Sequence, residues 1–416
     1  MRFLPAGNTP GEALRAGGRR PSDPENLSIS GQAFLLSTAK RLFLVFALWL
    51  AGLGAAAQYG KISVLFQPLA EGYGRSEPVT GLLVSSVGLV GILFGAIAGG
   101  LVAAIGAKPS LILGLALGAA VSFVQALGLP FVLLIGTRII EGISHLMLVV
   151  AAPTLIAALS PPAFRGALLT LWGTFFGDAL ALLVWLGLPL SDSFGIWLVF
   201  WAHGLYMSFF GAVLAFSIPS SASATDVDLR HAWQQQFLVY RSPALAAPAV
   251  GWLFYTFTFV SLFTLLPPFV PEENRAFVIG MMPLISIVSS LTIGTALLRR
   301  ITAIQVVMLG FATAGSAGVF LMFFPGNMVI IFALTAALGL IQGASFAAVP
   351  ELVSDDEGRA RANGGMAQMG NLGNTLGTPV LALVISISGH LGMMVLACLV
   401  LGAGFGAHAL MANARA

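Results

Sequence analysis

Ionisable side chains lie within long apolar stretches of this 416-residue sequence, where a charge is costly and needs a reason. Arg138, Glu141 and His145 are spaced three and four residues apart, so one helix would carry them on a single face. Arg138 and Glu141 can neutralise each other. They form either an ion pair that locks the helix against a neighbour, or a cavity-facing pair in which protonation of Glu141 frees Arg138 to bind an anion.

Two further charges have no evident partner in the sequence. Asp178 lies in the middle of an apolar stretch. Burial in an apolar setting favours the protonated form of a carboxyl group, which suits a proton carrier. A protonated Asp178 that only hydrogen-bonds a neighbouring helix is the alternative. Lys61 comes late in the first stretch and either faces the interior or extends its ammonium group to the outer interface. His203 is expected to be structural.

The second half of the chain places amides and hydroxyls, rather than charges, in its apolar stretches. Tyr255 and Gln342 are such groups, and Gln368, Asn371 and Thr375 share one helix face. A polar stripe of this kind either joins helices within the bilayer or faces a central cavity. In the second case, charges in the first half would handle a proton or an anionic group, and the amides would recognise the rest of a solute.

These residues need long helices to position them, and the composition predicts helices that span a membrane. Apolar residues make up 58% of the chain and charged residues 8%, against about a quarter charged in ordinary soluble domains. The mean hydropathy is +0.95. Twelve apolar runs are about 20 residues or longer, as a membrane span requires. They cover roughly 42–69, 79–105, 110–129, 131–158, 166–188, 195–218, 244–269, 277–298, 302–324, 327–350, 364–388 and 391–411.

The sequence also repeats itself about two hundred residues apart. The run 139–144, Ile-Ile-Glu-Gly-Ile-Ser, returns at 340–345 as Leu-Ile-Gln-Gly-Ala-Ser, and the Gly-x-x-x-Gly pattern at 173–177 returns at 373–377. Such repeats indicate two related halves with a solute site at their seam, near the bilayer midplane. We therefore predict an all-α membrane protein of twelve helices in two six-helix halves. Its predicted parts are a cytosolic disordered tail (1–40), a first half (41–218), a cytosolic linker (219–243) and a second half (244–412).

Basic residues give the orientation, because they are enriched on the cytosolic side of membrane proteins. If the N-terminus is cytosolic, fifteen of the 19 Lys and Arg residues fall on the cytosolic side. Only Arg75 and Arg275 fall outside, and Lys61 and Arg138 lie within spans. An error of one span would scramble this partition. We expect a multi-pass protein of the inner, or cytoplasmic, membrane with both termini cytosolic.

The motifs on these spans resemble those of the major facilitator superfamily across residues 40–412. Arg138-Ile-Ile-Glu-Gly142 is similar to the Arg-x-x-x-Gly motif of the family's fourth helix, whose arginine faces the central cavity and is linked to proton coupling. Residues 99–108 are similar to the family's signature cytosolic loop, but Ala103 and Ala104 replace its Asp and Arg. The fifth span has Gly177-Asp178 where antiporters of the family often carry Gly-Pro, which weakens an antiport interpretation.

The resemblance implies a secondary transporter that moves a small organic solute by alternating access, coupled to protons. An anionic or aromatic solute, such as a vitamin, a siderophore or an aromatic acid, and uptake are favoured. The first alternative is proton-driven efflux of drugs or metabolites. The second alternative is a non-transporting membrane sensor or assembly factor with the same fold. The pathway is assigned to Lys61, Arg138, Glu141, His145, Asp178, Tyr255, Gln342, Gln368 and Asn371. The sequence has no phosphate-binding loop, zinc-ligand spacing or nucleophile elbow. We expect that the protein is not an enzyme and that it binds no cofactor and no nucleic acid. We also expect it to be a monomer.

Overall fold

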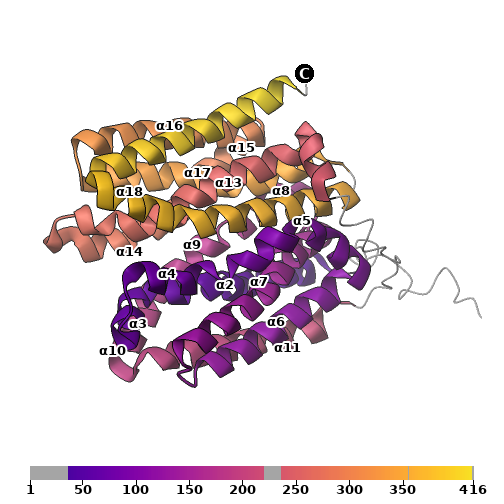
Figure 1. Cartoon of the computed structure of the whole chain (residues 1–416). Coiled ribbons are helices and arrows are strands. Elements are labelled where there is room, and N and C mark those ends of the chain that lie inside the picture. The colour runs from indigo at the N-terminus through magenta and orange to yellow at the C-terminus, as the bar shows by residue number, and fades with distance from the viewer. Residues whose placement is uncertain (1–35, 220–235, 355, 415–416) are drawn as a thin grey trace, which may run out of the picture.

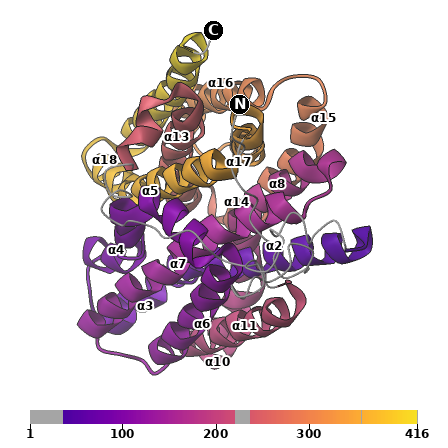
Figure 2. The same cartoon turned by 90° about the vertical axis from the view of Figure 1, so that its right-hand side faces the viewer.

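The computed structural model describes residues 36–219, 236–354 and 356–414, and within these ranges the chain forms helices joined by short turns and no strands. Figure 1 shows two bundles of helices packed against each other, the first coloured indigo to magenta and the second orange to yellow. The turned view in Figure 2 shows the same two groups. The predicted all-α fold with two halves is confirmed.

The first bundle holds six spans, several of which are broken into shorter helices. A break between α4 and α5 divides the second span, and one wider, π-helical turn at 183–187 interrupts the fifth. In chain order the helices are α2 (Thr38–Val64), α3 (Phe66–Tyr73), α4 (Glu77–Ser85), α5 (Gly88–Ile105), α6 (Ala107–Gln125), α7 (Phe131–Leu159), α8 (Arg165–Gly173), α9 (Phe175–Leu182), α10 (Leu188–Phe194) and α11 (Ile196–Ser217).

The second bundle repeats this plan. The second span of this bundle, which is the eighth of the chain, is also interrupted by a π-helical turn, at 290–294. The helices are α13 (Pro243–Leu265), α14 (Glu272–Ser289), α15 (Thr295–Leu298), α16 (Ala303–Phe323), α17 (Met328–Leu352) and α18 (Asp356–Asn413). α18 contains two spans, because Gly389 has a φ of 61° and a ψ of −157°, which turns the chain back. A side chain would strain this left-handed backbone, so glycine suits the turn.

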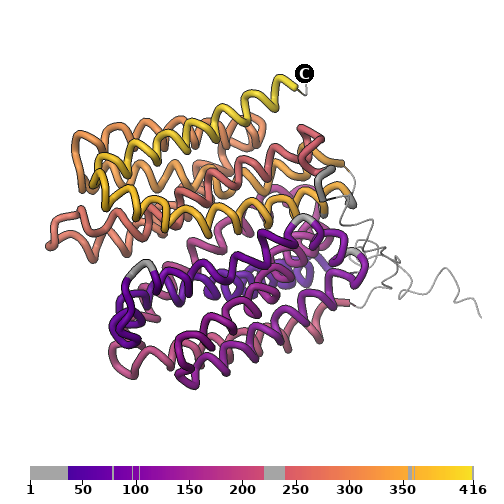
Figure 3. Tube along the Cα trace, viewed as in Figure 1, coloured from indigo at the N-terminus to yellow at the C-terminus, as the bar shows by residue number. Residues whose placement is uncertain are grey.

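Twelve spans are present in the described part of the chain, as predicted. Ten helical segments there are long and apolar enough to cross a membrane. One of them is α18, which supplies the eleventh and twelfth spans, and the broken pair α4 and α5 supplies the second. The tube in Figure 3 lets each span be followed by colour. Residues 1–35 of the predicted tail and most of the predicted linker lie outside the described residues. The end of the predicted tail is not disordered, because α2 already begins at Thr38. At the end of the predicted linker, Gln236–Arg241 forms a short 3₁₀ helix.

The two halves meet along two lines of helices. On one side, α5 packs along α18, and on the other, α8 and α9 pack against α14 and α17. Small residues make close approach possible, as in other membrane helices. A Cβ added at Gly91 would come within 2.2 Å of Asn371 Nδ2, and one at Gly173 within 2.8 Å of the Gln342 carbonyl oxygen. Large apolar side chains such as Phe216 are exposed on the outside, where lipid would contact them.

Candidate functional site

A cluster of charged side chains lies inside the first half. Lys61 extends from α2, and Arg138 and Glu141 extend from α7, where Glu141 and Gly142 lie three and four residues after Arg138. All three charged side chains are fully buried. Lys61 Nζ lies 2.5 Å from Glu141 Oε1, and Arg138 Nη1 binds Glu141 Oε2. One carboxylate therefore faces two cations, and these three groups carry a net charge of +1.

Polar groups from α6 and α11 complete this cluster. Gln125 Nε2 donates to Glu141 Oε2 at 2.9 Å. Lys61 Nζ also lies 2.9 Å from Ser122 Oγ and 3.2 Å from His203 Nδ1. His203 Nε2 lies 2.9 Å from the Gly54 carbonyl oxygen, to which it must donate. In the neutral ring Nδ1 then has one lone pair, which Ser122 Oγ at 2.5 Å and Lys61 share as donors. Lys61 thus has an acceptor for each of its three N–H bonds.

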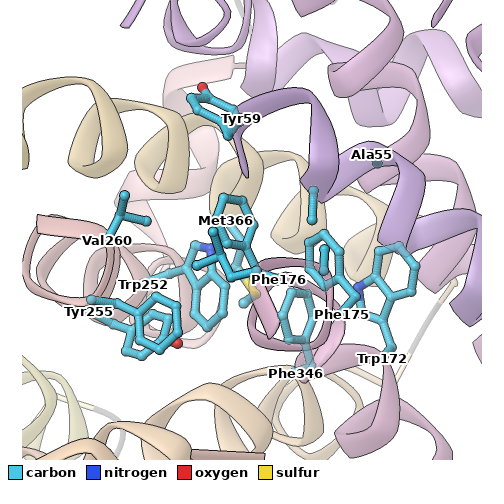
Figure 4. Close-up of a cluster of buried hydrophobic side chains, with 14 of the residues drawn as sticks. Ala55, Tyr59, Trp172, Phe175, Phe176, Trp252, Tyr255, Val260, Phe346 and Met366 are labelled. Atoms are coloured by element: carbon cyan, nitrogen blue, oxygen red, sulfur yellow. The ribbon is translucent and has the colours of Figure 1, made fainter. Parts of the chain in front are cut away.

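A second site lies at the seam between the halves, where aromatic rings surround a cavity of about 50 Å³. Figure 4 shows these rings. Trp172 stacks on Phe175 with centroids 4.5 Å apart, and Trp252 lies 4.6 Å from Tyr255 and 4.9 Å from Phe346. The lining contains no Lys, Arg, Asp or Glu. Besides the Tyr255 hydroxyl and the Trp172 and Trp252 indole N–H groups, its polar residues are His145, Thr256, Gln342, Asn363, Asn371 and Asn374. Both halves contribute, as a solute site at the seam requires.

Tyr59 connects the surroundings of the cluster to the other half. It is almost fully buried on α2, two residues before Lys61. Its hydroxyl donates to Asn371 Oδ1 on α18 at 2.8 Å. Its ring meets His145 edge-on, with centroids 5.0 Å apart. Asn371 and His145 both line the cavity. A displacement of one half against the other would therefore act on this hydrogen bond directly.

Asp178 lies apart from both sites. It is half-buried on α9, on the same face as the exposed Leu182 and Trp185. Thr174 Oγ1 donates to Asp178 Oδ2 at 2.5 Å, and the Trp49 indole lies beside the carboxyl group. Asp178 makes no ion pair with any residue that the structure describes. The preceding residue, Gly177, packs against α14 and α17 of the other half, and Phe175 and Phe176 line the cavity.

The structure therefore divides the predicted site residues into groups. Lys61, Arg138 and Glu141 meet in the cluster, and none of them lines the cavity. His145, Tyr255, Gln342 and Asn371 line the cavity. Gln368 lies on the seam, where its amide donates to the Ile92 carbonyl oxygen at 2.8 Å and accepts from Tyr240 at 2.5 Å. Lys61 faces the interior, and the alternative in which it reaches the outer interface does not match its burial.

Several residues of these sites were not singled out from the sequence. Ser122 and Gln125, one helical turn apart in an apolar span, were a readable signal for a polar face, whereas His203 was expected to be only structural. Trp172 and Phe346 gave no signal, because aromatic residues occur both at membrane surfaces and in ligand cavities. Among the residues described, no group of three or more His, Cys, Asp or Glu side chains could hold a metal ion.

Comparisons with known proteins bear on the family and the fold of this chain. The family model described as Major Facilitator Superfamily matches residues 44–378. The chain belongs to the major facilitator superfamily. The crystal structure of the human organic anion transporter MFSD10 (TETRAN) is similar, with a TM-score of 0.74, 16% sequence identity and coverage of 88% of this chain and 99% of that one. No curated protein sequence matches this chain.

A second solved superfamily member has the same fold. This is the transporter FucP in the outward conformation, with a TM-score of 0.69, 16% identity and coverage of 91% of this chain and 99% of that one. At these identities the likeness concerns the fold alone. The family and the fold point to a multi-pass membrane transporter, and the predicted family is confirmed.

Proposed function

We propose that this protein is a secondary active transporter that moves a small organic solute across the inner membrane by alternating access. The observation that carries the proposal is the cavity at the seam, which both halves line with aromatic rings and a few amides. Ligand sites in proteins commonly have this character, with apolar walls and a small number of placed polar groups. At about 50 Å³ the cavity is far smaller than the several hundred Å³ of a typical ligand site, so the halves must separate to admit a solute.

Proton coupling through Asp178 is the second part of the proposal. A proton carrier must lose and regain its charge in each cycle. Glu141 is held as a carboxylate by two cations and an amide, so protonating it would leave Lys61 and Arg138 uncompensated. Asp178 has only a hydroxyl and an indole beside it, and its neighbour Gly177 contacts the other half. Protonation of Asp178 can therefore change the packing of α9 at the seam.

Uptake is the proposed direction, because Gly177-Asp178 stands where antiporters of the family often carry Gly-Pro. Proton-driven efflux is the alternative. An anionic solute is a second candidate, and the net charge of the Lys61–Arg138–Glu141 cluster favours it, together with Arg138 Nη2, which lacks a hydrogen-bond partner among the described residues. A non-transporting sensor is disfavoured, because a scaffold has no need to bury charges in a membrane.

Proteoliposomes with a pH-sensitive dye inside test the proposal. Small aromatic solutes, including vitamins, siderophores and aromatic acids, are added one at a time with and without a proton gradient. We expect at least one solute to move protons and to accumulate against its own gradient. Asp178→Asn should abolish accumulation but retain solute exchange, because its amide cannot release a proton. Asp192→Asn, an exposed carboxylate at the outer end of the same span, is the matched control and should behave as the parent.

Two results would contradict parts of the proposal. If Asp178→Asn still concentrates the solute, and collapse of the proton gradient leaves the parent unaffected, proton coupling through this residue is wrong. If no solute in the collection moves through the parent protein or drives protons, the transporter assignment itself fails.

A further inference from the structure

The cavity at the seam is lined by buried hydrogen-bonding groups that have no partner among the described residues. They are the indole nitrogen of Trp172, the hydroxyl of Tyr255, Nε2 of Gln342 and Oδ1 of Asn374. All four side chains line the cavity, and each is more than nine-tenths buried. Leaving such groups unpaired is costly in a protein interior, so their gathering in one place needs an explanation.

We infer that this site binds an uncharged, flat aromatic molecule that carries hydrogen-bond acceptors on opposite edges. The inference rests on the proposed function and names its solute class.

The charge follows from the lining, which contains no Lys, Arg, Asp or Glu. An ion placed among these rings would be buried without a compensating charge. The nearest candidates are turned elsewhere. Lys61 uses all its N–H bonds on Glu141, Ser122 and His203. Arg138 binds Glu141 and the Leu83 carbonyl oxygen, and although its Nη2 has no partner among the described residues, Arg138 does not line the cavity. The solute that matches this lining is therefore neutral.

The unpaired groups specify the polar edges of the solute. The Trp172 indole can only donate a hydrogen bond, and the amide of Gln342 and the hydroxyl of Tyr255 can donate as well. Asn374 supplies an acceptor. Donors thus predominate, so the solute must be rich in acceptors, as ring nitrogens and carbonyl oxygens are. Trp172 belongs to the first half, whereas Tyr255, Gln342 and Asn374 belong to the second. A molecule with acceptors on two edges would bridge the halves.

The aromatic side chains of the lining indicate the shape of the solute. Trp172 and Phe175 are nearly parallel, at 12°, and Trp252 contacts Tyr255 and Phe346 (Figure 4). Aromatic side chains pack favourably on the faces and edges of another ring. A flat ring system between the Trp172 and Trp252 groups would touch both halves when they close on it.

Binding to the purified full-length protein in lipid nanodiscs, measured by calorimetry, tests this inference with two pairs of probes. Nicotinamide and nicotinate share one ring and differ in charge. Quinoxaline and naphthalene share one shape, and only quinoxaline has acceptor nitrogens. We expect nicotinamide to bind at least about fivefold more tightly than nicotinate, and quinoxaline at least about fivefold more tightly than naphthalene.

Tyr255→Phe is the decisive variant because it removes only the unpaired hydroxyl. Quinoxaline affinity should fall about three- to tenfold. The melting temperature without probe should stay level or rise, since a buried group without a partner has been removed. Trp172→Phe should weaken binding in the same way. Trp197→Phe, at a tryptophan that does not line the cavity, is the matched control and should leave binding unchanged.

Equal affinity for the two probes of either pair would overturn the inference. The absence of binding of both nicotinamide and quinoxaline to the parent protein would also overturn it. So would unchanged quinoxaline affinity in both Tyr255→Phe and Trp172→Phe. Proteoliposomes separate this inference from the proposed function. Transport of an anionic solute in preference to neutral ones would overturn the solute class and leave transport standing. Binding of the neutral probes without any transport would contradict transport and support the site.

Discussion

Glu141→Gln should destabilise this protein strongly, because it removes the one negative charge of the buried Lys61–Arg138–Glu141 cluster. The glutamine keeps the shape of the side chain and leaves two buried cations, so the net charge of the cluster rises from +1 to +2. Its new amide NH2 group must face either Lys61 or the donors of Gln125 and Arg138, so donors oppose each other in both orientations. Breaking a buried ion pair by removing one partner typically costs about 3–5 kcal/mol, and we expect a loss in this range.

Removing Lys61 instead should cost much less. Lys61→Met leaves Glu141 paired with Arg138, so these groups become neutral overall, and Ser122 and His203 retain their contact of 2.5 Å. The flexible methionine fills a similar space. We expect a cost below about 2 kcal/mol, mostly from lost hydrogen bonds. In the double variant, Lys61→Met with Glu141→Gln, Arg138 is the only charged side chain left in the cluster. The net charge of the cluster is then +1, as in the parent protein. The double variant should recover about 1–3 kcal/mol relative to Glu141→Gln alone.

Unfolding of the purified protein by heat and by increasing detergent, followed by circular dichroism, measures these differences. Glu71→Gln, at an exposed carboxylate of α3, is the control and should unfold with the parent. A stable Glu141→Gln protein, or a double variant no more stable than the single one, would refute the charge argument. It would also return Glu141 to consideration as the proton carrier, because a carrier must tolerate its uncharged form.

Two other predictions concern the seam and the topology. Gly91→Ala should lower the melting temperature by displacing Asn371, at a cost of about 1–3 kcal/mol. Gly100→Ala on the same helix meets nothing within 4 Å and should be neutral or stabilising by up to about 1 kcal/mol; equal behaviour of the two variants would contradict the close contact. Single cysteines that replace Ser223 or Glu272, in a Cys398→Ser background, should react differently in intact cells. A membrane-impermeant thiol reagent should label only the cysteine at position 272. Labelling of the cysteine at position 223 would contradict the predicted orientation.

The elements and contacts local to one helix were predictable from the sequence. Arg138 and Glu141 are three residues apart, and helical geometry alone brings them together. The polar stripe of Gln368, Asn371 and Thr375 follows from the same periodicity. The twelve spans follow from length and hydropathy, which the absence of water in a bilayer makes strict.

Contacts between helices were beyond the sequence, because periodicity defines a face and not what it faces. Nothing in the spacing of Lys61 shows that it meets Glu141, eighty residues further on, with Ser122 and His203 around it. Trp172 and Trp185 lie on one span, yet Trp172 is fully buried at the cavity and Trp185 is exposed. In a membrane protein both surroundings are apolar, so residue type does not separate them.

The hydrogen bonds inside the first half are stronger than those between the halves, which favours a motion of each half as a unit. Inside the first half, charged hydrogen bonds join α2, α6, α7 and α11 around Glu141. Among the described residues, four hydrogen bonds across the seam join neutral groups, and one of them runs from Ser85 Oγ to the Thr375 carbonyl oxygen at 3.5 Å. Tyr59 binds Asn371 at 2.8 Å, Gln368 binds the Ile92 carbonyl oxygen at 2.8 Å, and Trp185 binds that of Gly280 at 3.3 Å.

A neutral hydrogen bond contributes about 1 kcal/mol net, so breaking these four costs about 4 kcal/mol. A solute bound with micromolar affinity contributes about 8 kcal/mol, and a difference of a few kcal/mol in its affinity for two conformations is enough to shift their populations. The same solute could not break the cluster around Glu141 without leaving buried charges unpaired, which is far more costly. Rocking of intact halves about the seam is therefore the motion that these contacts permit.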